Sequence, residues 1–265
     1  MKYTVLFLVC VLLLHIPLVA QDTFAEKLSA SPRHHEWVTL EDGDRELYAF
    51  VAYPEIAEKA KVVIVIHENR GLNSWARLFT DQLAAKGFIA IAPDLLSNVN
   101  DSIAKTTDFS NSDEARSAIY GLDSDRVTAD LNLVFNYAKT LEAANGEVSV
   151  VGFCWGGSQS FRYATNNSQL EEAIVFYGTA PKEKETLLQI EIPVFGFYGG
   201  NDNRVNATIE PTKEILDAAE KTYTYEIYEG AGHAFMRRAE EAPEGDPNKI
   251  ASDKAWKTLV SILKK

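Results

Sequence analysis

The chain has 265 residues, of which 46% are hydrophobic, so it is long enough to bury one sizeable core. Its formal net charge is -12 and no basic patch stands out, which excludes nucleic acid and anionic membrane surfaces as expected partners.

The first 20 residues have the pattern of a secretory signal peptide. Lys2 precedes an apolar run at residues 5–14, and Ala20 is a small residue before a cleavage point at Gln21. A membrane anchor is the alternative. However, the apolar run is short for a membrane span, and His15 follows it directly. We therefore expect export to the periplasm or the medium, with no membrane contact after cleavage.

Removal of a signal peptide would leave one cysteine in the mature protein. Of the two cysteines, Cys10 leaves with the signal peptide, so Cys154 is expected to be the single thiol of the mature protein. A single cysteine cannot form an internal disulfide, and a lone thiol in an exported chain calls for another explanation. A buried structural cysteine is one possibility, while a redox sensor is disfavoured because no second cysteine could resolve it.

Residues 21–35 are predicted to be a poorly ordered leader, followed by one domain at 36–265. Strands at 36–39 and 47–53, joined by an acidic turn, form a predicted hairpin at the sheet edge. Residues 97–121 are polar and predict an irregular segment with short helical turns at best. Apolar runs predict buried strands at 61–66, 88–92, 148–153, 173–177 and 194–198, and a half-exposed strand is expected at 222–228.

Helical periodicity occurs between these strands. Predicted helices lie at 74–86, 126–141, 155–163, 211–221 and 251–263, with Gly87 ending the first and Asp123 capping the second. Strands that alternate with helices predict an α/β fold: a doubly wound, mostly parallel sheet with helices on both faces. In such sheets the ligand site lies at the carboxyl ends of the strands.

The most informative motif is GFCWGG at residues 152–157, which stands between a predicted strand and a predicted helix. This is the setting of a nucleophile elbow in α/β-hydrolases, here with cysteine in the position of the usual serine. The neighbouring glycines suit a sharp, strained turn in which strand and helix approach closely. A Gly-rich turn with a buried cysteine is the alternative.

Polar residues follow three other predicted strands at the same edge. Glu68 follows the strand at 61–66, Asp202 follows 194–198, and His233 follows the strand that ends near 228. With Cys154 they give the order nucleophile, acid, histidine, which is the order of α/β-hydrolases. His233 would carry the proton between nucleophile and leaving group, and Asp202 would orient its ring.

The oxyanion of such a reaction needs two N–H donors, which we place at the backbones of Trp155 and Asn69. Each residue also has a simpler interpretation. Asp202 could pair with Arg204 in a surface turn, and Glu68 could pair with Arg70 or cap a loop. His233 could be a buried core histidine, whereas His67 is interpreted as structural and as shaping the oxyanion loop.

No spacing of His, Cys, Asp or Glu predicts a metal site, and no Gly-rich phosphate loop or dinucleotide motif predicts a cofactor. We therefore predict an enzyme that uses no cofactor.

These motifs together resemble the dienelactone hydrolase family, whose members are α/β-hydrolases similar to carboxymethylenebutenolidase. The similarity spans about residues 36–264 and rests on five segments: HENRGL at 67–72, APDLLS at 92–97, GFCWGG at 152–157, YGGND at 198–202 and GHAF at 232–235.

The resemblance implies a triad of Cys154, His233 and Asp202, with Glu68 in contact with the resting thiol and helping to generate the thiolate. Two arginines of the family bind the substrate carboxylate. Arg237 matches one of them, but the segment that should carry the other offers Asn98. This departure argues against dienelactone itself as the substrate.

We therefore expect a monomeric hydrolase of small esters or lactones that acts through an acyl-enzyme. Arg237, Arg70 and Asn98 are its candidate substrate-binding residues, and residues 97–121 and 236–248 could form a lid. A thioesterase or acyltransferase would use the same residues. A binding protein without catalysis would show no labelling of Cys154 by electrophiles at neutral pH, and a thiol peroxidase would turn over peroxide.

Overall fold

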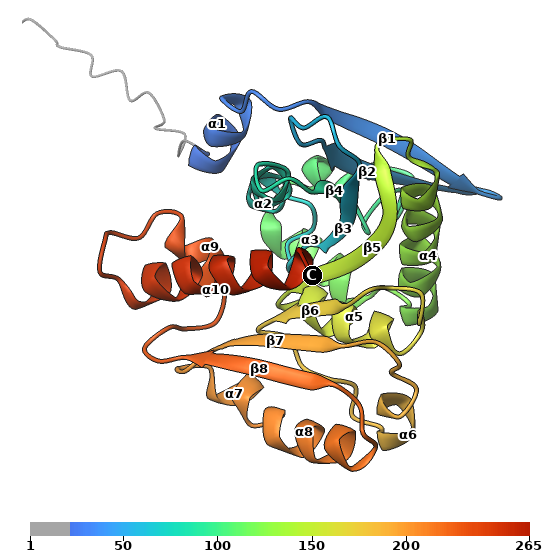
Figure 1. Cartoon of the computed structure of the whole chain (residues 1–265). Coiled ribbons are helices and arrows are strands. Elements are labelled where there is room, and N and C mark those ends of the chain that lie inside the picture. Colours follow the sequence, from blue (N-terminus) through green and yellow to red (C-terminus); the bar gives the residue numbers. More distant parts are fainter. Residues whose placement is uncertain (1–21) are drawn as a thin grey trace, which may run out of the picture.

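The computed structural model describes residues 22–265, so the predicted signal peptide lies outside the described residues. Its centre is an eight-stranded sheet with the order β1-β2-β4-β3-β5-β6-β7-β8 (Figure 1). The strands are β1 (His35–Asp42), β2 (Arg45–Ala52), β3 (Ala60–Ile66), β4 (Ile89–Pro93), β5 (Ala144–Phe153), β6 (Ala173–Phe176), β7 (Val194–Gly199) and β8 (Tyr223–Tyr228).

The first hairpin is antiparallel, and β2 pairs with β4 in the same sense, whereas all pairs from β4 to β8 are parallel. This confirms the predicted doubly wound, mostly parallel sheet. The helical elements are α1 (Thr23–Ser29), α2 (Ser74–Ala84), η1 (Thr106–Asp108), α3 (Ser112–Tyr120), α4 (Ser124–Thr140), α5 (Trp155–Ala164), α6 (Lys184–Leu187), α7 (Asn203–Asn206), α8 (Ile209–Ala218), α9 (Phe235–Ala239) and α10 (Pro247–Leu263).

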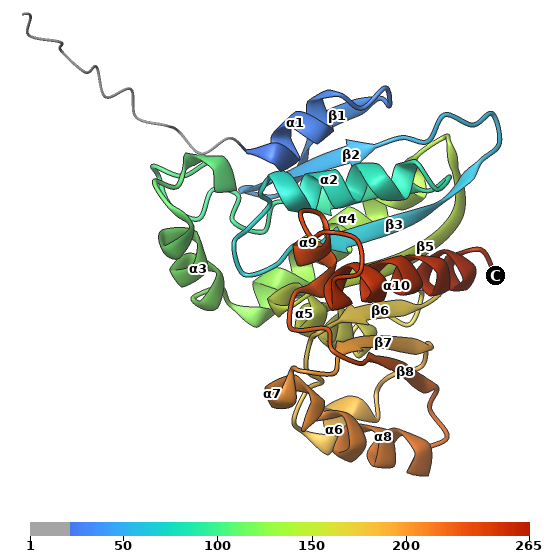
Figure 2. The same cartoon turned by 90° about the vertical axis from the view of Figure 1, so that its left-hand side faces the viewer.

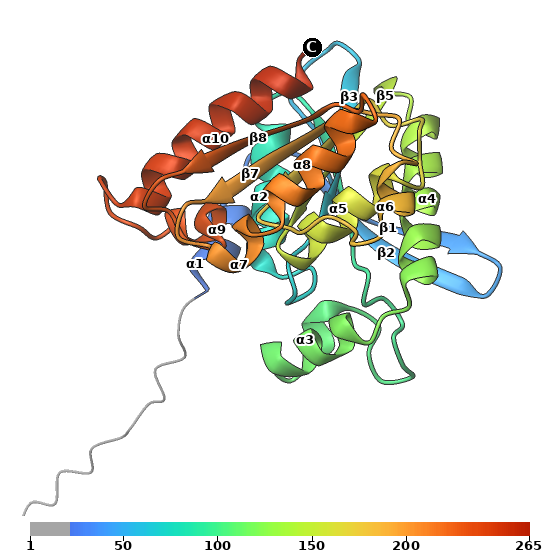
Figure 3. The same cartoon turned by 90° about the horizontal axis from the view of Figure 1, so that it is seen from below.

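Alternation along the central strand β3 divides the core in two. Val62 and Ile64 pack on the side covered by α4, α5 and α8, while Val63 and Val65 pack on the side covered by α2 and α10. Figure 3 shows these two helix layers on opposite sides of the sheet. Because β3 is covered on both faces, its sequence is a continuous β-branched run without polar alternation.

Two segments are more regular than their sequences suggest. Part of the expected leader at 21–35 forms α1, which Asp22 caps by accepting hydrogen bonds from the backbone N–H groups of Phe24 and Ala25. Leu28 is its buried residue, and the helix packs against α2. The structure therefore differs from the expected leader at Thr23–Ser29, where Leu28 and Phe24 pack against the core and Lys27 pairs with Glu240.

The segment 97–121 was likewise expected to hold short turns at best, yet α3 is a helix of nine residues. Asn111 caps it, and Ala115 and Ile119 bury one face. Figure 2 shows α3 standing out from the two helix layers, at the end of the sheet where α5 begins. Among residues 22–265, no helix is both long and apolar enough to cross a membrane.

Candidate active site

Cys154 occupies a strained turn between β5 and α5. Its backbone angles, φ 56° and ψ −114°, lie outside the regions that most residues adopt. The turn is tight because a Cβ at Gly152 would lie 2.0 Å from the carbonyl oxygen of Gly156. A Cβ at Gly156 would lie 2.3 Å from the carbonyl oxygen of His67. Glycine is therefore required at both positions, and the cysteine stands at the top of the sheet.

Asp202 and His233 meet near this turn. Asp202 follows β7, His233 follows β8, and the Nδ1 atom of His233 lies 2.5 Å from Oδ2 of Asp202. The carboxylate is buried, whereas the histidine side chain keeps 29% of its surface exposed. Asp202 thus holds one ring nitrogen and leaves Nε2 facing outward from the pair. No ion pair joins Asp202 to Arg204 among residues 22–265, although a surface pair between them was the simpler interpretation.

Two backbone donors lie close to the sulfur of Cys154. The N–H groups of Trp155 and Asn69 act on the thiol and lower its pKa. Burial and the negative charge of Glu68 raise the pKa more strongly than the two N–H groups lower it. The pKa of Cys154 is therefore raised to about 11. The thiol is therefore protonated at neutral pH, and the two N–H groups mark a point that could hold an oxyanion.

Glu68 is buried beside the thiol, with 3% of its surface exposed. Its Oε2 accepts a hydrogen bond of 2.7 Å from Nε of Arg237, and its Oε1 accepts one of 3.4 Å from the hydroxyl of Tyr177. The partner of Glu68 is thus Arg237, which comes from α9, and not the neighbouring Arg70. The same arginine is the one that the family resemblance assigns to a substrate carboxylate.

Tyr177 is not among the functional residues that the sequence predicts. It follows β6 with a backbone φ of 41°, its ring centroid lies 5.1 Å from that of His233, and its hydroxyl contacts Glu68. Burial and the charges of Glu68 and Cys154 raise its pKa well above the ordinary value, so it is a neutral hydrogen-bond donor. Its position at the carboxyl end of a buried strand was the available signal.

His67 supports the loop that carries Asn69. Its Nδ1 lies 2.8 Å from the backbone oxygen of Glu68, to which it donates, and its Nε2 accepts a hydrogen bond from the backbone N–H of Leu95. The ring stacks on the indole of Trp155 at 5.8 Å. Complete burial lowers the pKa of His67, so it stays neutral. These contacts agree with a structural role and connect the two candidate oxyanion donors.

The side chain of Asn69 reaches α3, where its amide donates to the hydroxyl of Tyr120 at 3.2 Å. Trp155 also packs against the apolar face of α3, which includes Ala115 and Ile119. The segment proposed as a lid therefore touches both residues that supply the backbone donors.

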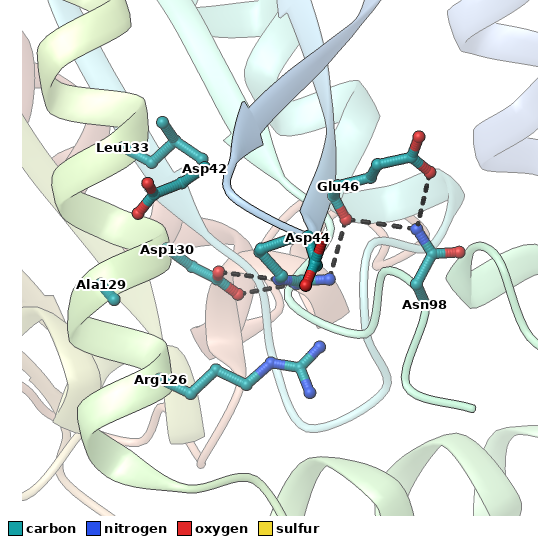
Figure 4. A pocket seen from close by; sticks show the side chains of 9 residues that line it. Asp42, Asp44, Glu46, Asn98, Arg126, Ala129, Asp130 and Leu133 are labelled. Atoms are coloured by element: carbon teal, nitrogen blue, oxygen red, sulfur yellow. Dashed lines mark hydrogen bonds and ion pairs between the residues drawn. The ribbon is translucent and has the colours of Figure 1, made fainter.

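Asn98 lies apart from the residues around the thiol. Its amide donates to the backbone oxygen and the carboxylate of Glu46, near the turn between β1 and β2 (Figure 4). It lines a cavity of about 450 Å³ together with Arg45, Arg126 and Asp130, and no residue of the thiol site lines that cavity. The structure thus gives Asn98 a contact with the hairpin and none with Cys154, Asp202 or His233.

Arg70 is exposed and lines a different cavity, of about 270 Å³, between α2 and the segment that precedes α3. Of the three candidate substrate-binding residues, Arg237 is therefore the one in contact with the residues around the thiol. Within residues 22–265, no group of three or more His, Cys, Asp or Glu side chains is arranged to hold a metal ion.

The chain is similar to known proteins in both sequence and fold. The sequence is 32% identical over 209 residues to a candidate carboxymethylenebutenolidase of Yersinia pestis, covering 74% of this chain and 77% of that protein. It is 29% identical over 247 residues to another from Methylorubrum extorquens, covering 86% and 83%. The fold matches a candidate dienelactone hydrolase from Klebsiella pneumoniae with a TM-score of 0.77 at 22% identity, covering 89% of this chain and 100% of that one.

Residues 47–265 match the dienelactone hydrolase family as a whole. The match covers most of the chain and includes Glu68, Cys154, Asp202 and His233. The chain therefore belongs to the dienelactone hydrolase family and is a hydrolase with the α/β-hydrolase fold.

Proposed function

We propose that the protein hydrolyses small carboxylic esters or lactones through an acyl-enzyme on Cys154, with His233 and Asp202 completing the triad. The observation that carries the proposal is that two backbone N–H groups, from Trp155 and Asn69, lie near enough to the sulfur of Cys154 to lower its pKa. A carbonyl carbon attacked by this sulfur would place its oxygen close to the same donors.

The first step is removal of the thiol proton. Glu68 is the carboxylate whose charge acts on the thiol, and it accepts this proton as substrate binds. The thiolate attacks the carbonyl carbon, a carbon–sulfur bond forms, and the carbonyl electron pair moves to oxygen. The N–H groups of Trp155 and Asn69 then hold that oxyanion.

The intermediate collapses to a thioester as the bond to the leaving oxygen breaks. His233 enters this step as an imidazolium and gives the leaving oxygen the proton on its Nε2, while Asp202 keeps its ring oriented through the 2.5 Å contact to Nδ1. His233 then takes a proton from water, which attacks the thioester and releases the acid. The sulfur leaves as a thiolate and regains the proton held by Glu68, which restores the starting state.

The substrate class follows from the family and from the cations near the sulfur. The relatives named carboxymethylenebutenolidase point to a lactone, and Arg237 is available to a substrate carboxylate if Glu68 releases it. Asn98 binds the hairpin instead of facing the thiol, so the second arginine of the family has no counterpart there. We therefore propose the reaction class and leave dienelactone itself aside.

The test is hydrolysis of a short-chain nitrophenyl ester and of an unsaturated γ-lactone by the purified protein and by the C154A and D202N variants. Because the nucleophile and the orientation of His233 are each needed for the chemical step, kcat should fall at least about a hundredfold in both. Ser29→Ala, far along the chain on α1, is the control and should leave kcat unchanged. Full activity of C154A would refute the proposed nucleophile.

Export and oligomeric state are also proposals. We propose that residues 1–20 are removed as a signal peptide and that the mature protein is a monomer. Mass spectrometry of the protein recovered outside the cytoplasm should give a chain that begins at Gln21, and light scattering should give the mass of one chain. An intact Met1 or the mass of a dimer would contradict the respective proposal.

A further inference from the structure

A second cavity lies beside the loop that carries Asn69, and no step of the proposed reaction uses it. It has a volume of about 270 Å³ and opens between the first turn of α2, the turn at η1 and the first turn of α3. Arg70 and Arg77 contribute to its wall, and neither Cys154, Asp202 nor His233 does.

The two arginines of this cavity have no carboxylate within ion-pair distance among residues 22–265. Arg70 is exposed at the mouth. Arg77 is partly buried beside the ring of Trp37, and its Nε is fully covered without a hydrogen-bond partner. Burial lowers the pKa of Arg77, as expected for a guanidinium that has lost water without gaining a contact anion.

The two carboxylates whose charges act on Arg77 are already used elsewhere. Asp22 caps α1 and accepts a hydrogen bond from Ser74, while Asp94 accepts hydrogen bonds from Thr106 and from the backbone of Leu96. Their charges act on Arg77 from a distance, but neither makes a hydrogen bond to it. No hydrogen bond or ion pair within residues 22–265 engages Arg70 or the two Nη atoms of Arg77, so these donors, unlike the covered Nε of Arg77, are free to bind an added anion.

The remaining wall of the cavity supplies donors rather than charges. Asn73 uses its side-chain oxygen to cap α2, which leaves its NH₂ group available, and free hydroxyls come from Thr107 and Ser112, whereas the hydroxyl of Ser74 already donates to Asp22. No Asp or Glu lines the cavity, although the chain has 38 acidic and 26 basic residues. In the cavity of Figure 4, by contrast, Arg45 is neutralised by Asp130 and further acids line the wall.

We propose that the cavity formed by Arg70, Arg77, Asn73 and the facing hydroxyls is a binding site for a phosphate-type oxyanion. Inorganic phosphate and the terminal phosphate of a small monoester share the required chemistry: several acceptor oxygens and a double negative charge. Two guanidinium groups with adjacent hydroxyls suit such a group, because the planar fork of arginine pairs with two oxygens at once. The site is separate from the thiol and goes beyond ester hydrolysis.

The test is calorimetric titration of the purified protein with inorganic phosphate and with phenyl phosphate, at constant ionic strength in a buffer without oxyanions. Saturable binding at one site should appear in the millimolar range or tighter. R70Q and R77Q should each weaken it at least about tenfold, since each removes charge-assisted hydrogen bonds. R116Q is the matched control, because Arg116 is exposed on α3, pairs with Asp113 and lies outside the cavity.

Tighter binding of phenyl phosphate would support a monoester as the ligand, and equal or weaker binding would support free phosphate. Phosphate should also raise the unfolding temperature of the wild type and of R116Q, but not of R70Q. Because Arg70 is exposed, R70Q decides the matter even if R77Q does not fold. Absence of saturable binding, or equal heats from sodium chloride, or R70Q behaving like R116Q, would overturn the proposal.

Discussion

The ion pair between Glu68 and Arg237 allows a quantitative prediction. The R237Q substitution leaves a carboxylate that is 3% exposed without its cation, which lay 2.7 Å away. Removing one partner of a fully buried pair costs about 3–5 kcal/mol. Because the side chain of Arg237 is 25% exposed, water can replace part of the interaction, and we expect a loss of about 2–4 kcal/mol. For a chain of this size that lowers the unfolding temperature by about 5–15 °C.

The assay is thermal unfolding followed by circular dichroism for the wild type, R237Q, E68Q and the double variant. Replacing both charges by amides removes the uncompensated carboxylate, so the double variant should be more stable than the sum of the single effects predicts. R238Q is the matched control, because Arg238 is the next residue of the same helix, is exposed, and forms no ion pair or hydrogen bond with Glu68. We expect R238Q to unfold within about 2 °C of the wild type.

Two results would refute this reasoning. If R237Q unfolds at the temperature of R238Q, the pair does not stabilise the fold. If the losses of R237Q and E68Q simply add in the double variant, the two side chains act independently, and the lost stability of R237Q comes from packing of the arginine stem.

Three further predictions concern the thiol of Cys154, the turn that carries it, and Asp202. Because its pKa is about 11, the rate of alkylation of Cys154 by iodoacetamide should rise about tenfold per pH unit from pH 7 to 10, and E68Q should shift the profile to lower pH; a plateau near pH 8 would contradict this. The G156A variant should lose soluble expression or unfold at least about 3 kcal/mol more easily, since its Cβ would lie 2.3 Å from a backbone oxygen; wild-type stability in a chemical denaturation curve would contradict the tight turn. In D202N the loss should fall on kcat with little change in KM, and steady-state kinetics that show the reverse would assign Asp202 to substrate binding.

The central sheet could be predicted from sequence because its signals are local. A strand buried on both faces, such as β3, needs an apolar side chain at every position, and that pattern is visible in seven consecutive residues. The elbow at Cys154 was visible for a similar reason, since the turn permits no Cβ at Gly152 or Gly156. The family match then confirmed the fold class that these patterns predict.

Short helices and the first turns of longer helices were harder to predict, because neighbouring elements and capping residues stabilise them. α1 has seven residues and one buried side chain, Leu28, which is too little for a periodic apolar pattern. α10 begins at Pro247, four residues before its predicted start, because Asp246 caps it and proline fits the first helical turn. The apolar pattern marks only the part of a helix that packs on the core.

The environment of Glu68 was outside the reach of local patterns. Its partners Tyr177 and Arg237 lie 109 and 169 positions away along the chain. They meet because β3, β6 and the loop after β8 all end at the same edge of the sheet. The sequence indicates which residues stand at that edge, but the choice between Arg70 and Arg237 as the partner depends on three-dimensional distance alone.

The resting thiol changes how catalysis should be distinguished from mere binding. Burial and Glu68 keep Cys154 protonated, so its thiolate fraction at pH 7 is about 100-fold lower than that of a free cysteine. Slow labelling by an electrophile at neutral pH is therefore expected of the active enzyme as well as of a binding protein without catalysis. In the mechanism proposed above, a substrate that engages Arg237 would leave Glu68 without its cation and able to take the thiol proton. Turnover of an ester or lactone, lost in C154A, is consequently the measurement that separates the two, and labelling is informative only when substrate is present.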